Sequence, residues 1–188
     1  MILLAAILGV LLSTITVLTA SRAVFADQTS NEQNYVDAGD VTLIDNDGGV
    51  NVLFEIDDMA PGDSETTCIN VTYQGSISDP GPVLVYSGGL TDSGSLADDL
   101  NLSIEEGTGA TTFDDCTGFT LDGLVFDDTL GAFDASHIDY SSGVGSWDPS
   151  STPDSSSYRI TVELDADAAS TSQGEAVTDL IFTWEVQS

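Results

Sequence analysis

Short runs of apolar residues recur along the chain from about residue 41 onwards, and several of them alternate with polar residues. In 68–73 and 158–164 the apolar and polar side chains take opposite faces, as in a strand with one buried face. Clusters of Gly, Pro, Asp and Ser separate the runs, and sustained helical periodicity is rare. We therefore predict strands over 41–44, 50–56, 66–73, 83–86, 100–105, 118–126, 158–165 and 177–186.

The remaining segments complete the predicted fold. A short helix is expected over 95–99, and the stretch 141–157, rich in Ser, Gly, Pro and Asp, is expected to be the longest loop. A body of about 160 residues is large enough for one domain with its own core. The predicted fold class is all-β: an antiparallel β-sandwich with short helical insertions over residues 41–188.

The first 20 residues form an uncharged and mostly apolar run, followed by the small-residue junction Val24-Phe25-Ala26. This pattern predicts a signal peptide over 1–24 with cleavage near 23–26, although the usual positively charged start is missing. A retained single-span anchor and a pilin-like retained helix are the alternatives, because about 20 apolar residues can cross a bilayer. Residues 25–40 are polar and would form an N-terminal arm.

The chain is strongly acidic, with 32 Asp and Glu residues and a net charge of −30. Without the leader, Arg159 is the remaining cation beside those 32 acids, and the net charge is −31. Such a surface repels polyanions, which excludes nucleic acid and anionic membranes as partners. Self-repulsion of this size indicates a high-salt habitat, with an ordinary acidic secreted protein as the alternative.

Cys68 and Cys116 are the two cysteines of the chain. In an exported protein they most simply form one disulfide, while two free thiols or a metal-binding pair are the alternatives. A bridge that closes a loop of about 50 residues stabilises the fold by about 4 kcal/mol in the chain-entropy model.

We predict no catalytic residues and no cofactor. His137 is the sole histidine, so neither a His-Glu-x-x-His zinc site nor a Ser-His-Asp set is present. Paired carboxylates such as Asp57-Asp58 are sequence neighbours that would point to opposite faces of a strand. Calcium is the one metal with candidate ligands, Asp45 and Asp47, in an oxygen-rich segment that also reads as a plain hairpin turn.

Two sequons, Asn70-Val71-Thr72 and Asn101-Leu102-Ser103, lie within predicted strands. The alternation of side chains places Asn70 and Asn101 opposite their apolar neighbours, on the solvent side. Both are glycosylation candidates if the host modifies exported proteins.

Several groups of residues, in order along the chain, resemble the TasA and camelysin family, whose members are exported with a SipW-type signal. These groups are the junction 23–27 with the strand-like 35–43, the turn 58–64 leading into 68–76, the small helix 96–100 and the closing strand 173–184. The chain departs from the family in its missing basic start, its two cysteines and its acidity.

The resemblance implies a jelly-roll β-sandwich that polymerises into extracellular fibres of a biofilm matrix, with related archaeal bundling pili built alike. In such fibres an N-terminal strand of one subunit completes a sheet of the next, a contact called donor-strand complementation. Here the donor strand would come from the arm 25–40, with Phe25, Ala26 and Tyr35 as its apolar anchors.

The expected partner is therefore a second copy of the chain in a head-to-tail homopolymer, without nucleic acid and without a membrane after leader cleavage. The expected location is secreted, at the cell surface or in a matrix fibre. Three alternatives stay open: an arm folded on its own subunit, a monomeric surface module that binds calcium or carbohydrate, and a camelysin-type secreted metalloprotease.

Overall fold

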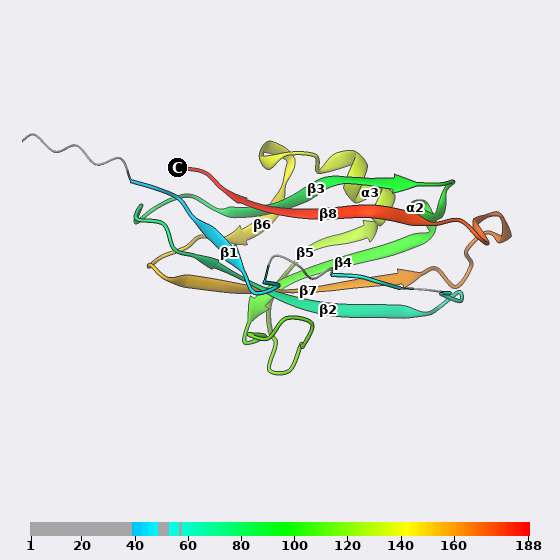
Figure 1. Ribbon diagram of the computed structural model, residues 1–188, viewed down its shortest axis with the longest axis horizontal. Coiled ribbons are helices and arrows are strands. Elements are labelled where there is room, and N and C mark those ends of the chain that lie inside the picture. The colour runs from blue at the N-terminus through cyan, green and yellow to red at the C-terminus, as the bar shows by residue number, and fades with distance from the viewer. Residues whose placement is uncertain (1–38, 49–52, 57) are drawn as a thin grey trace, which may run out of the picture. The chain divides into compact units, whose positions relative to one another are not determined.

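The computed structural model describes residues 39–48, 53–56 and 58–188, which form two antiparallel β-sheets packed face to face (Figure 1). The predicted all-β sandwich with short helical insertions is confirmed. Residues Gly39–Ser188 make up one compact unit. The predicted signal peptide, 1–24, and residues 25–38 of the predicted arm lie outside the described residues.

The larger sheet has five strands in the order β1-β2-β7-β4-β5. The strands are β1 (Leu43–Asp45), β2 (Ser64–Tyr73), β7 (Asp154–Leu164), β4 (Leu100–Thr108) and β5 (Thr120–Thr129). β1 is short: Leu43 lies opposite Tyr73, and Asp45 lies opposite Val71. β1 therefore pairs along the last three residues of β2, at one end of the sandwich.

The smaller sheet has three strands in the order β6-β3-β8, and it lies above the larger sheet in Figure 1. Its strands are β6 (Val144–Trp147), β3 (Val83–Asp92) and β8 (Val177–Val186). The connections carry four short helical segments: α2 (Leu96–Asp99), α3 (Leu130–Ser136), and the 3-10 turns η1 (Tyr140–Ser142) and η2 (Ser170–Ser172).

The core fills the space between the sheets with side chains from alternate strand positions. Leu102 and Ile104 of β4, Tyr158 and Ile160 of β7 and Val85 of β3 are completely buried. These side chains come from the middle strands of both sheets. The period-two pattern read from the sequence therefore corresponds to the inner faces of the sandwich.

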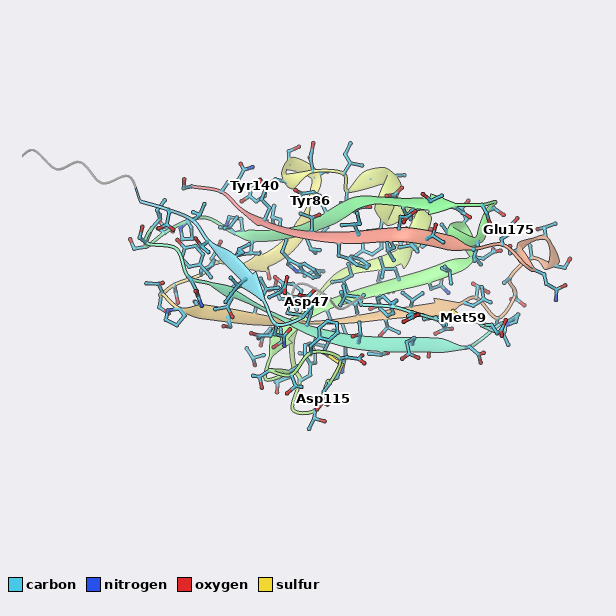
Figure 2. All side chains as sticks on the ribbon, in the orientation of Figure 1. Asp47, Met59, Tyr86, Asp115, Tyr140 and Glu175 are labelled. Carbon is cyan, nitrogen blue, oxygen red and sulfur yellow. A yellow bond between two sulfur atoms is a disulfide. The ribbon has the colours of Figure 1, made fainter. Side chains whose placement is uncertain are left out.

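Residues 109–119 form a loop on the outer face of the five-stranded sheet, with Asp115 at its tip (Figure 2). The predicted disulfide is confirmed: Cys116 in this loop is bonded to Cys68 of β2, with their Cα atoms 5.2 Å apart. The backbone N–H of Asp114 donates to the Cys68 carbonyl oxygen over 2.9 Å. The loop covers the outer side of β2 at Cys68, which is therefore buried like its inward-facing neighbours Thr67 and Ile69. The prediction of a single buried face is wrong here.

Other boundaries also differ from the sequence prediction. The predicted loop 141–157 contains β6 and the start of β7, because Trp147 pairs with Val83 and Val144 pairs with Val85. The helix α3 was not predicted. Its seven residues are too short for a visible helical period, and the helix begins where the Thr129 hydroxyl accepts a hydrogen bond from the Ala132 N–H.

Candidate functional site

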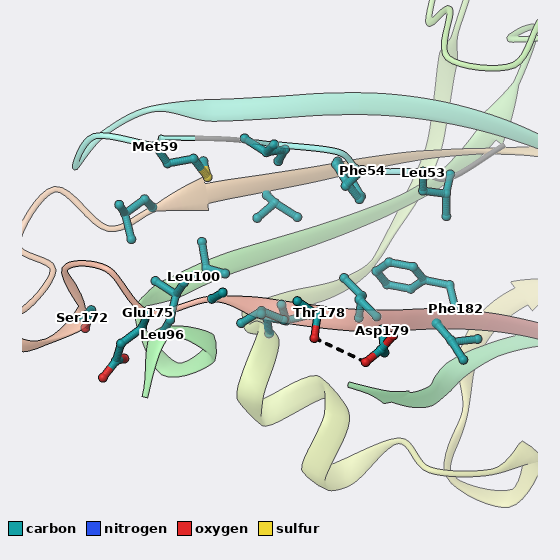
Figure 3. A pocket seen from close by; sticks show the side chains of 18 of the residues that line it. Leu53, Phe54, Met59, Leu96, Leu100, Ser172, Glu175, Thr178, Asp179 and Phe182 are labelled. Carbon is teal, nitrogen blue, oxygen red and sulfur yellow. Dashed lines mark hydrogen bonds between the residues drawn. The ribbon is translucent and has the colours of Figure 1, made fainter. Parts of the chain in front are cut away.

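An apolar groove of about 1340 Å³ runs between the sheets on the side where β8 faces β1 and β2. We call it the β8 groove. One wall is β8, with Leu180, Phe182 and Trp184 among its lining residues. The opposite wall consists of β1 and of residues 53–56 and 58–61 (Figure 3). The floor is the core of the sandwich, reached at Ile69, Val71, Leu100, Val162 and Leu164.

The groove exists because the two sheets differ in width. The five-stranded sheet extends beyond the three-stranded sheet on the side of β1 and β2, so part of its apolar inner face is not covered by a facing strand. Among the described residues, β8 pairs with β3 and with no other strand. Its second edge is therefore a row of backbone N–H and C=O groups available to another strand.

The edge of β8 is regular over its second half. From Phe182 to Val186 the pairing with β3 continues without a shift. The register shifts between Phe182 and Ile181, which lies opposite Gly89, and it shifts again before Ile181, where Asp179 has a positive φ of 56°. Such irregularities bend an edge strand and interrupt a ladder. The stretch 182–186 is therefore the part of the edge best suited to a regular new ladder.

The wall segments 53–56 and 58–61 contribute side chains to the groove but do not pair with a strand. Leu53, Phe54 and Met59 are partly buried against the core and line the groove (Figure 3). In the described part of this segment, 53–56 and 58–61, no residue belongs to a strand. The strand predicted over 50–56 is therefore wrong for residues 53–56. The apolar residues of this segment resemble a strand because they pack against the core at the groove wall, but they do not join a sheet.

The rim of the groove is acidic. Asp45, Asp47, Asp58, Glu175 and Asp179 all line it, and the described lining residues include no lysine or arginine. Burial raises the pKa of Asp45, and a hydrogen bond with the neighbouring Asp47 raises that pKa further. A rim of this charge disfavours anionic ligands.

Two buried polar groups lack a hydrogen-bond partner among the described residues: the hydroxyl of Tyr158 in the core and the indole Nε1 of Trp184, which lines the groove. Their rings lie 5.5 Å apart between centroids. Burial, and after it the nearby Glu106, raises the pKa of Tyr158, which keeps this hydroxyl a neutral donor. The groove wall thus holds one buried donor, the Trp184 indole, on a mostly apolar surface.

The opposite side of the sandwich is closed. The carboxyl group of Glu106, on β4 of the larger sheet, accepts hydrogen bonds from the backbone N–H of Ser146 over 3.0 Å and of Trp147 over 3.2 Å. It also accepts one from the Ser146 hydroxyl over 2.7 Å. Ser146 and Trp147 belong to β6, so Glu106 ties the two sheets together. This role of Glu106 cannot be predicted from the sequence, because Glu106 is one of many acidic residues.

The predicted donor-strand anchors Phe25, Ala26 and Tyr35 lie outside the described residues, so their placement stays a prediction. Asp45 and Asp47, the calcium candidates, lie beside each other at the groove rim, and the Asp47 N–H donates to Asp45 Oδ1 over 3.2 Å. Within the described ranges, no group of three or more His, Cys, Asp or Glu side chains is arranged to hold a metal ion.

The two sequons differ in their surroundings. Asn70 is half-buried, and its side-chain amide donates to the Ser156 carbonyl oxygen over 3.2 Å and to the Ser157 hydroxyl over 3.1 Å. Asn70 lies on the outer face, opposite the buried Ile69 and Val71 as expected, but its side chain is only partly exposed there. The loop 109–119 and the neighbouring strand β7 account for this, because both contact that outer surface. Asn101 is exposed, as expected.

His137 lies at the carboxyl end of α3, where its N–H donates to the Phe133 carbonyl oxygen over 2.9 Å. Its ring packs against Phe126 and Phe133, with centroid distances of 5.4 Å to each, and its Nδ1 is hydrogen-bonded to the Ser142 carbonyl oxygen. These contacts give His137 a structural place that ties α3 to η1.

No protein-family model matches the chain, and comparison with curated proteins yields no match. In the part of the chain that the structure describes, no helix is long and apolar enough to cross a membrane.

Proposed function

We propose that this protein is a secreted, non-enzymatic structural subunit that polymerises by donor-strand complementation into extracellular fibres. The observation that carries the proposal is the β8 groove, in which the unpaired edge of β8 lies beside an apolar surface. A strand that entered there would gain main-chain hydrogen bonds from β8, while its alternate side chains would be buried against the core. The occupant is the N-terminal arm of a second copy.

The length of the arm fits the groove. Residues 25–38 number fourteen and reach at most about 46 Å when extended. The ten residues of β8 span about 33 Å. About four arm residues then remain to cross from one subunit to the next. The sequence resemblance to the TasA and camelysin family supports the same assembly.

Charge sets the conditions for assembly. The arm carries acidic residues, as does the groove rim at Asp45, Glu175 and Asp179. Because like charges would be brought together, we expect polymerisation to require molar salt or divalent cations, which screen the repulsion over about 3 Å at 1 M ionic strength. A contact of this head-to-tail type does not close on itself and yields a filament.

The test is removal of residues 25–34 from the mature chain, followed by negative-stain imaging over a range of salt concentrations. We expect filaments from the intact mature chain and folded monomers from the truncated one, with equal unfolding midpoints in urea. A matched control keeps the arm length but scrambles the order of residues 25–34, which separates side-chain recognition from mere reach. Filaments of normal appearance after the truncation would contradict strand donation.

A monomer across all salt conditions would instead favour the alternative of a surface binding module. A small apolar molecule would then be the expected groove ligand, because the walls carry Leu53, Phe54 and Phe182. Chelator-sensitive peptide cleavage by the pure protein would favour the metalloprotease alternative.

A further inference from the structure

The chain enters the sandwich at a defined end and in a defined direction. The Asp40 carbonyl oxygen accepts a hydrogen bond from the Ser76 N–H over 2.9 Å, and the Asp40 N–H donates to the Ser76 hydroxyl over 2.9 Å. Ser76 follows the end of β2, beyond Tyr73. A methyl group on Gly75 would lie 2.6 Å from the Asp40 carbonyl oxygen, so this approach is close. The chain therefore points away from the groove as it is followed back toward its start.

The same end of the sandwich holds the end of β8. Val186 of β8 is clustered with Tyr73 and Val83, and Leu43 packs against this cluster. The opposite end of the groove is marked by Met59 and Glu175, which line its two walls toward the other end of the sandwich (Figure 2). β8 therefore runs from the Glu175 end to the end at which the arm leaves.

We propose that the arm of a neighbouring copy enters the β8 groove at the end marked by Met59 and Glu175 and lies antiparallel to β8. This inference rests on the proposed function. In an open filament with one kind of contact, all subunits point the same way along the axis. An arm that leaves one subunit at the Val186 end then meets the Glu175 end of the next. Followed from residue 38 toward residue 25, it runs inward from Glu175 to Val186.

An arm that filled the groove of its own subunit would have the other polarity. It would have to reverse direction between residue 38 and Asp40, since β1 already runs antiparallel to β8, and it would then lie parallel to β8. Strand polarity thus distinguishes a neighbour's arm from the subunit's own arm.

The antiparallel arrangement assigns the anchors to the two ends. Tyr35, close to the sandwich of the donor, would be buried near Met59 and Leu100 at the entry end. Phe25 and Ala26 would reach the far end, near Trp184 and Val186. The regular edge 182–186 would then pair with the first half of the arm, and the bulge at Asp179 would face its second half.

Cross-linking between two differently labelled copies tests the polarity. One copy carries a cysteine in the arm, Thr29→Cys or Asn34→Cys, and the other carries one in β8, Thr178→Cys or Thr183→Cys. Both threonines line the groove, and the native cysteines are already paired. Mixed filaments are treated with a short bismaleimide. We expect the pairs 34 with 178 and 29 with 183 to give at least about tenfold more dimer than the swapped pairs, because proximity raises the effective concentration.

Asp122→Cys on β5, an exposed residue of the other edge strand of the larger sheet, serves as the control and should give background cross-linking. Filaments in which the swapped pairs dominate would overturn the polarity and leave strand donation standing. Filaments without any cross-link to β8 would overturn both. Cross-linking within single chains of a doubly substituted monomer would show self-insertion and would overturn both as well.

Discussion

The two long sides of the sandwich differ in how the space between the two sheets is closed. On the β5 and β6 side, Glu106 joins the sheets by three hydrogen bonds to Ser146 and Trp147, and α3 buries Phe133 in the core. On the β1 and β8 side, the sheets are separated by the β8 groove, and Ile181 on its edge is 51% exposed. The space between the sheets is closed by contacts within one chain on the first side, whereas the second side offers apolar surface beside an edge of β8 that is unpaired among the described residues.

This difference bears on function because an exposed edge strand is usually protected in a protein that remains monomeric. β8 has one protective feature, the bulge at Asp179, but its second half is regular. An apolar groove beside such an edge indicates that a strand from elsewhere belongs there. Each prediction below compares a substitution in one region of the sandwich with a matched substitution in another region.

The largest effect is expected from truncating a phenylalanine of the core and one of the groove wall, whose ring centroids lie 5.8 Å apart. Phe133→Ala removes a completely buried ring and should lower the free energy of unfolding of the monomer by about 4 kcal/mol. Phe182→Ala removes a partly buried groove-wall ring and should cost about half as much. Urea unfolding of monomers at fixed salt measures both. Equal losses would mean that the groove is already filled in the monomer.

A smaller effect is expected at Glu106. Glu106→Ala leaves three donors of β6 without their acceptor and should cost about 3 kcal/mol in the same measurement. Glu163→Ala, at an exposed position of β7, is the control and should change the free energy of unfolding by less than about 0.5 kcal/mol. If the two variants were equally stable, Glu106 would not close that side.

The smallest effects concern pH. The raised pKa of Asp45 means that its contribution to stability is present at low pH and is lost as the pH rises through that raised value. Asp45→Asn should therefore raise the urea midpoint at pH 7 and leave it unchanged in acid. Hydrogen bonds from Thr117 lower the pKa of Asp115, so Asp115→Asn should lower the midpoint at pH 7, with the difference disappearing as the pH falls through that lowered value. Identical pH profiles for the two variants would contradict these assignments.

The sequence predicted the strands far better than their partners. Val177–Val186 was predicted with its observed bounds, because ten residues of β-rich sequence between turn signals are a local property. That β8 is an edge strand beside a groove depends on the number of strands in each sheet, which no local pattern reveals. The apolar residues 53–56 illustrate the limit: they look like a strand, yet they cover the groove without pairing.

The disulfide could be predicted from the sequence, but the burial of the outer face of β2 that results from it could not. Two cysteines in an exported chain suggested the Cys68–Cys116 bridge. The bridge holds the loop 109–119 against the outer face of β2, where the loop buries Cys68 and contributes to the half-burial of Asn70. Asp114 of the loop also accepts a hydrogen bond from the Thr67 hydroxyl. Alternation predicts a polar residue on an outer face, but it does not show whether another segment covers that face.

Hydrogen exchange of backbone amides in monomers and in filaments tests the central claim most directly. In the monomer the amides of residues 182–186 that point away from β3 should exchange rapidly. In the filament they should become protected, while the free edge of β5 should exchange as before. Filaments in which the β8 amides exchange as fast as in the monomer would contradict the account, and so would full protection of that edge in the monomer.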